Sequence, residues 1–144
     1  MQAGREERRR DACATGEGWA VGYDSGVGKT VVLLHELPDG TSHYDWMIDA
    51  GGEGLMTFRL RELPRWGETA EFEAQRIADH RREYLAYEGP VPGRRGTVRR
   101  EAEGTVEARE DSPGRMTVRV RMGDDETSYR GEELQPGKWR WIRG

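Results

Sequence analysis

The fold of this chain is decided by residues 31–45, which read VVLLHELPDGTSHYD. An apolar, β-branched run comes first, a Pro-Asp-Gly turn follows at residues 38–40, and a second run of alternating character completes the stretch. Pro38 suits the first turn position, and Gly40 suits the left-handed position that closes a three-residue hairpin loop. The stretch therefore predicts a β-hairpin centred on Asp39.

The predicted hairpin register brings three chemically important side chains together. A turn centred on Asp39 makes His35 and His43 cross-strand partners, and it pairs Leu33 with Asp45. Side chains two residues apart on a strand share a face, so Asp45 lies on the same face as His43. Two imidazoles and a carboxylate at one point are suitable ligands for a divalent transition metal. The simpler alternative is a pair of half-exposed strand histidines, which are common in hairpins. The register favours the metal site, because a one-residue slip would send His35 to the opposite face.

Length and composition favour one small β domain. The chain has 144 residues, of which 34% are hydrophobic and 35% are charged, so the core must be small and the surface densely ionic. Short strand-like runs after residue 96 are separated by Asp-Ser-Pro-Gly and Gly-Asp-Asp turns. This spacing predicts a mainly β fold, an antiparallel β-barrel or curved sandwich. We expect a charged, flexible arm at residues 1–16 and a single domain at residues 17–144.

One principal helix is expected between Glu68 and Tyr87. This stretch contains no glycine or proline and is rich in alanine, glutamate and arginine, a composition typical of helices. On such a helix His80 and Tyr84, which are four residues apart, would share one face. A partly buried histidine beside a core tyrosine is the plain structural alternative.

Charge, cysteine usage and hydropathy exclude several classes of protein. A net charge of −4 argues against nucleic-acid binding over the whole surface. The only cysteine is Cys13, which excludes an internal disulfide or a Cys-rich zinc site and suits a reducing cytosol. No apolar run approaches transmembrane length, so we expect a soluble, cytoplasmic protein. Residues 26–30 look like the end of a nucleotide-binding P-loop, but Tyr23 stands where its first glycine is required.

A second informative block covers residues 78–98, which read ADHRREYLAYEGPVPGRRGTV. An Asp-His pair, a tyrosine four residues later, an aromatic-Glu-Gly triplet and a glycine-rich loop leading to Gly-Thr-Val follow one another. This order resembles the 3′-phosphoesterase domain of bacterial DNA ligase D. His35 and the triplet at residues 43–45 look like the metal motif of the same family. In length the chain is most similar to the short stand-alone relatives of that domain.

The resemblance implies a metal-dependent phosphoesterase. His35, His43 and Asp45 would ligate manganese or another divalent transition metal, and His80 and Tyr84 would contact the scissile phosphate. The implied substrates are 3′-phosphate or 3′-ribonucleotide ends of DNA or of a DNA/RNA strand, processed during repair by non-homologous end joining. A DNA ligase or polymerase of that process is the implied partner, and we expect a monomer.

A local basic face accompanies this block. Residues 79–100 carry six arginines against three acidic residues. Such a face could hold a nucleic-acid end although the whole chain is acidic, and a solvated arginine-rich surface is the alternative for any one of them. The six are Arg81, Arg82, Arg94, Arg95, Arg99 and Arg100.

Met47 departs from the family pattern. The ligase-fused domains have an arginine two residues after the aspartate, where this chain has Met47. Arg59, on the next expected strand, is the candidate replacement. Loss of this cation favours an alternative function, a non-catalytic, metal-containing module that binds nucleic-acid ends. A purely structural barrel is the third possibility, and it predicts that the histidines do not converge.

Overall fold

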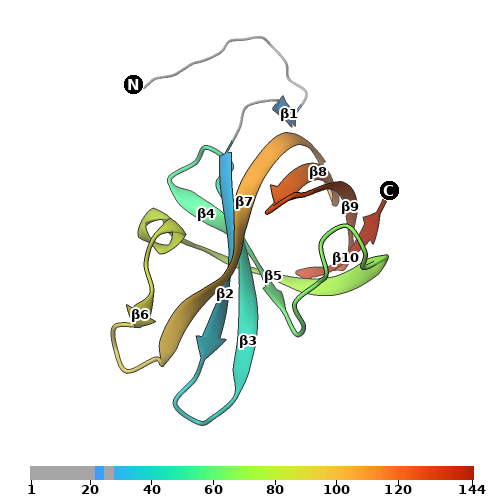
Figure 1. Ribbon diagram of the computed structural model, residues 1–144. Coiled ribbons are helices and arrows are strands. Elements are labelled where there is room, and N and C mark those ends of the chain that lie inside the picture. The colour runs from blue at the N-terminus through green and yellow to red at the C-terminus, as the bar shows by residue number, and fades with distance from the viewer. Residues whose placement is uncertain (1–21, 25–27) are drawn as a thin grey trace.

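The computed structural model describes residues 22–24 and 28–144, and the predicted arm at residues 1–16 lies outside this range. Strands make up most of the described chain (Figure 1). Their bounds are β1 Gly22–Asp24, β2 Gly28–Glu36, β3 Ser42–Ile48, β4 Gly54–Leu60, β5 Glu71–Arg81, β6 Gly89–Pro90, β7 Thr97–Ser112, β8 Arg115–Met122, β9 Asp125–Gln135 and β10 Lys138–Arg143. A single short 3₁₀ helix, η1, covers Arg82–Leu85 within this part of the chain.

Eight of these strands close an antiparallel β-barrel. The order around the barrel is β7-β2-β3-β4-β5-β10-β9-β8, and β8 pairs again with β7. The long strand β7 pairs with β2 near its start and with β8 further along, so it joins the two halves (Figure 1). Closure leaves none of the eight with an unpaired edge. The predicted antiparallel barrel is confirmed.

The predicted helix between Glu68 and Tyr87 is wrong. Residues 71–81 form β5, which pairs with β4 and β10, and only η1 follows as a helical turn. The helix-forming composition conceals an alternation in which Phe72 and Ala74 face the core and their neighbours face outward. Burial of this inward row between two strands outweighs a weak intrinsic propensity for helix.

The barrel interior is an aromatic core. Trp46 on β3 packs against Trp66 and Trp141 with ring centroids 5.2 and 5.1 Å apart, and Phe58 lies 5.2 Å from Trp141. Inward positions on neighbouring strands complete it with Val32, Ile48, Leu60, Val118 and Val120, all at most 1% exposed. Because these side chains fill the interior, the candidate site residues lie on the outer face of the barrel.

A second, smaller core lies on the outside of the barrel. Val31, Leu33, Met47 and Leu55 project outward from β2, β3 and β4 and are nevertheless buried. Residues 82–96, which we call the cover segment, lie over them and contribute Tyr84, Leu85, Tyr87 and Val91. The cover segment includes η1 and β6 and stands out from the barrel wall in Figure 1. The cover segment thus shelters part of an otherwise open sheet face.

No helix in the described chain has the length and apolar character to cross a membrane.

Candidate metal and phosphate site

The β2–β3 hairpin has the predicted register. His35 pairs with His43, and Leu33 pairs with Asp45. The Leu37 amide donates to the Thr41 carbonyl, and Gly40 adopts a φ of 91°, as a left-handed closing position requires. The three predicted ligand residues therefore share the outer sheet face.

The three side chains converge on one small volume. One ligand atom from each of His35, His43 and Asp45 lies within 4.8 Å of the other two. The Nε2 atom of His43 is 3.4 Å from Oδ1 of Asp45, and the Nδ1 atom of His35 is 3.8 Å from Oδ2. Asp45 is only 1% exposed. A buried carboxylate facing two imidazoles is a donor set that suits a divalent transition metal.

Two polar atoms of this cluster indicate how well a cation would fit. The Nε2 atom of His43 and the Oδ1 atom of Asp45 are buried, and neither finds a hydrogen-bond partner among the described residues. Buried polar atoms without a partner are uncommon and costly. A cation between the nitrogen and the oxygen would satisfy both at once, so the residues present fit a metal ion.

His35 is oriented by the cover segment. Its Nε2 atom lies 2.7 Å from the backbone carbonyl oxygen of Arg95. Because a carbonyl only accepts, Nε2 carries the proton of this hydrogen bond, and Nδ1 is the ring nitrogen directed at Asp45. Such an outer hydrogen bond fixes the tautomer and orientation of a ligating histidine.

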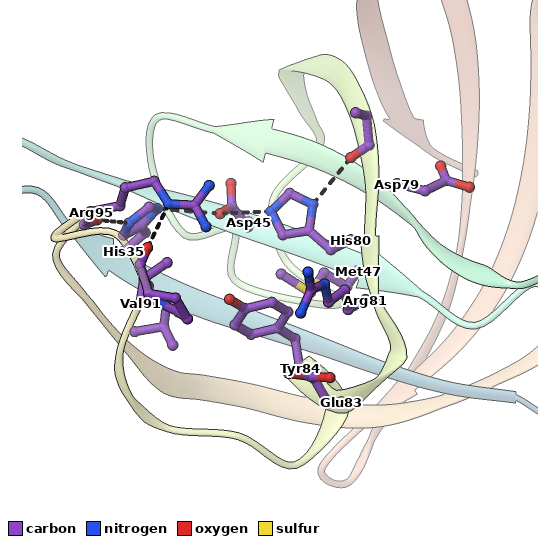
Figure 2. A pocket seen from close by; sticks show the side chains of 13 residues that line it. His35, Asp45, Met47, Asp79, His80, Arg81, Glu83, Tyr84, Val91 and Arg95 are labelled. Atoms are coloured by element: carbon purple, nitrogen blue, oxygen red, sulfur yellow. Dashed lines mark hydrogen bonds and ion pairs between the residues drawn. The ribbon is translucent and has the colours of Figure 1, made fainter.

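His80 reaches the same carboxylate from β5. One extra residue bulges from β5 between Ile77, which pairs with Thr57, and His80, which pairs with Leu55. The bulge changes which residues of β5 face outward, and it places His80 on the same outer face as Leu55. The Nε2 atom of His80 lies 3.8 Å from Oδ2 of Asp45. Its Nδ1 atom lies 3.1 Å from the Ala78 carbonyl, which accepts a hydrogen bond and leaves Nε2 directed at the cluster (Figure 2).

Tyr84 stands beside His80 but not on a shared helix. It lies on η1, and the two rings are 5.9 Å apart in an edge-to-face arrangement. Figure 2 shows the Tyr84 hydroxyl directed into the pocket. The structure thus brings both predicted phosphate-contacting residues close to the hairpin cluster, His80 from β5 and Tyr84 from η1.

These side chains line a pocket of about 330 Å³. His35, Asp45, His80 and Tyr84 all line it, and Asp45 lies between His35 and His80 (Figure 2). This volume falls within the roughly 300–1,000 Å³ that is usual for small-molecule sites. A phosphate group and a short part of its ester can therefore be accommodated.

Arg95 provides a cation at this pocket. Its Nε donates to the Pro92 carbonyl at 2.8 Å, which holds the side chain against the loop. Within the described chain its guanidinium pairs with no carboxylate, although it lines the pocket with His35 and Asp45. The sequence singled out a basic block here but gave no sign that, of its six arginines, Arg81 and Arg95 would line the pocket.

Met47 and Arg59 occupy different surroundings. Met47 is 1% exposed and packs in the outer-face core while its surface lines the pocket. Arg59, paired with Asp45 across β3 and β4, has its Nε 3.8 Å from Oδ1 of Asp45. It lines a different hollow, together with His43. Arg59 can balance the charge of Asp45, whereas Arg81 and Arg95 are the arginines that line the pocket with Met47.

An ion pair fastens the cover segment to the β3–β4 turn. Arg82 donates to Asp49 through Nη1 at 2.8 Å and Nη2 at 2.5 Å, and the Gly51 amide donates to the same carboxylate. Burial acts to raise the pKa of Asp49, but the hydrogen bonds from Arg82 and Gly51 and the charge of Arg82 outweigh it and hold the pKa below its usual value. The hydrogen bonds that Arg82 donates to Asp49 raise the pKa of Arg82. Asp49 and Arg82 are both ionised at neutral pH.

Neither a protein-family model nor a curated protein matches this sequence. The resemblance to the 3′-phosphoesterase domain of DNA ligase D therefore rests on the residues quoted above, and the functional reading rests on the geometry of the site.

Proposed function

We propose that this protein is a divalent-metal-dependent phosphoesterase, with manganese preferred, that removes 3′-phosphate or 3′-ribonucleotide groups from nucleic-acid ends in DNA repair. One observation carries the proposal. A cluster of two half-buried histidines and the buried Asp45, with two unpartnered polar atoms, lies at a pocket of about 330 Å³ that His80 and Tyr84 also line. Asp45 and His80 are 35 positions apart in the chain, so chance does not readily explain their convergence.

Each residue would have a distinct part in the reaction. His35, His43 and Asp45 would hold the ion, which when bound supplies a Lewis acid for a phosphate oxygen and lowers the pKa of a water. His80, with Nδ1 donating to the Ala78 carbonyl, presents Nε2 to the pocket, and as an imidazolium it can donate a proton from Nε2 to a phosphate or leaving oxygen. The hydroxyl of Tyr84 can donate a hydrogen bond to the same group as negative charge develops.

Arg95 would supply the cation that is missing at position 47. Its guanidinium pairs with no carboxylate in the described structure and lines the pocket beside His35 and Asp45. A guanidinium forms paired hydrogen bonds to phosphate oxygens. Arg95 would therefore compensate for Met47, the main departure of the sequence from the family pattern.

His80→Ala provides the test of this function. Phosphate release from an oligonucleotide with a 3′-phosphate is measured for wild type and His80→Ala, with Mn²⁺ and with a chelator. We expect metal-dependent release by wild type, and a loss of about 10²–10⁴-fold in the variant because a general acid is removed. The affinity for Mn²⁺ should change little, since His80 stands outside the three-residue cluster. Equal release by both proteins would refute the proposal.

Met47 favours a second candidate function, a module that binds nucleic-acid ends without turnover. The pocket floor at this position is apolar and buried rather than cationic. Tight, metal-dependent binding of a 3′-phosphate end by wild type without phosphate release would select this alternative.

A further inference from the structure

A second hollow adjoins the metal cluster on the same sheet face. It has a volume of about 520 Å³ and lies over the outward side chains of β4, β5 and the start of β10. Cross-strand pairing arranges Asp45, Arg59, Gln75 and Lys138 in one row, strand by strand. With neighbouring strands about 4.8 Å apart, this row extends roughly 14 Å from the cluster.

The hollow begins where the first pocket ends. His43 lines the hollow, Asp45 lines the pocket, and the two side chains approach to 3.4 Å. A chain whose terminal phosphate reaches the cluster could therefore continue directly into the hollow. The cover segment stands on the other side of the cluster and contributes no residue to the hollow.

The lining is mainly cationic, and two of its three cations form no ion pair within the described chain. Arg59, Arg61 and Lys138 line the hollow, and Glu73 is its one acidic residue. In the described part of the chain neither Arg61 nor Lys138 forms an ion pair, whereas Arg119 and Arg121 on β8 both pair with Glu126. Unpaired cations in a concave surface attract a polyanion most strongly.

We propose that this hollow, lined by Arg61 and Lys138, is a subsite for the backbone phosphates of the single strand that precedes the 3′ end. The subsite rests on the proposed function for its location beside the reacting phosphate. It explains how a chain of net charge −4 can bind nucleic acid, because the cations are gathered at one place. It also fixes the direction of the strand, with its 3′ end toward His80 and the upstream nucleotides over β4, β5 and β10.

The test compares a long and a short substrate. Wild type and the double variant Arg61→Ala/Lys138→Ala are assayed on a single-stranded oligonucleotide with a 3′-phosphate and on a nucleoside 3′-monophosphate, which is too short to reach the hollow. We expect KM to rise for the oligonucleotide only, with kcat unchanged. In fluorescence anisotropy, the salt dependence of oligonucleotide binding should weaken by about 1.4 in log–log slope, since each phosphate contact contributes about 0.7.

Two further variants make the comparison specific. Arg115→Ala removes an exposed arginine of β8 that does not line the hollow, and it should leave KM unchanged for both substrates. Glu73→Gln removes the acidic residue of the hollow and should strengthen oligonucleotide binding. A phosphate subsite predicts weaker oligonucleotide binding when the two cations are removed and stronger binding when Glu73 is neutralised.

The outcomes separate this subsite from the proposed function. Weaker oligonucleotide binding by the double variant supports the subsite, even if wild type releases no phosphate and the proposed function fails. Equal oligonucleotide binding by wild type and the double variant overturns the subsite. An equal rise in KM for both substrates also overturns it, because the two cations would then act on the reacting phosphate itself.

Discussion

Asp45 is the central residue of the site. It is 1% exposed and lies within 4 Å of a nitrogen from His35, His43, His80 and Arg59. A buried carboxylate at the meeting point of three imidazoles is expensive to desolvate unless a cation or hydrogen bonds compensate it. We infer that the site gains its full stability only with a metal bound.

Asp45→Asn should separate metal binding from folding. We expect Mn²⁺ at a hundredfold excess over its Kd to stabilise wild type by about 2.7 kcal/mol. The same addition should leave the melting temperature of Asp45→Asn unchanged, because one of three ligands is lost. Asp79→Asn is the matched control, since Asp79 lines the same pocket but pairs with Arg76. A full Mn²⁺ shift in Asp45→Asn would place the ion elsewhere.

The hairpin was predictable at the scale of elements because its information is local. The Pro38-Asp39-Gly40 turn fixes the register, and the register alone sets His35 opposite His43. β5 was not predictable in this way. Its residues have helical propensity, and the bulge that turns His80 outward has no signature in the sequence. The carbonyls of Arg95 and Ala78 that orient two histidines are likewise backbone groups, which leave no trace in side-chain patterns.

The cover segment positions His35 through a close approach at Gly96. Gly96 has a φ of 94°, and a Cβ there would lie 1.9 Å from the Glu36 carbonyl oxygen. Gly96→Ala should displace the loop, move the Arg95 carbonyl away from His35 and abolish phosphate release while the barrel stays folded. Gly114→Ala is the control, because its φ of 73° brings a similar strain of about 1–2 kcal/mol without any contact within 4 Å. Equal phosphate release by the two variants would contradict a positioning role for the loop.

The Asp49–Arg82 pair should hold the cover segment in a pH-dependent way. The folded-state pKa of Asp49 is depressed, so its stabilisation is fully present above the ordinary carboxyl pKa of about 3.9 and is lost as the pH falls through the lower folded value. Arg82 is 43% exposed, so Arg82→Gln should cost no more than about 1 kcal/mol at pH 7. This difference should vanish in strong acid. A free-energy difference that is constant from pH 7 to pH 2 in denaturant titrations would show that the ion pair is not its source.

At the scale of the whole molecule, the aromatic core and the candidate site lie on opposite faces of one sheet. Trp46, Phe58 and Trp141 fill the barrel interior, while Asp45 and the residues that pair with it across the strands point outward. Alternation along each strand produces this division automatically. Barrel closure through β7 and β8 depends on pairings distant in sequence, so only the fold class, and not the strand order, could be predicted.

The central claim is that this outer face holds a metal ion and a phosphate together. Anomalous diffraction at the manganese absorption edge, from crystals grown with Mn²⁺ and inorganic phosphate, tests it most directly. We predict one strong peak bonded to His35, His43 and Asp45, with phosphate density between that peak and the side chains of His80 and Tyr84. An empty His35–His43–Asp45 cluster at saturating Mn²⁺, or phosphate bound away from His80, would contradict the account.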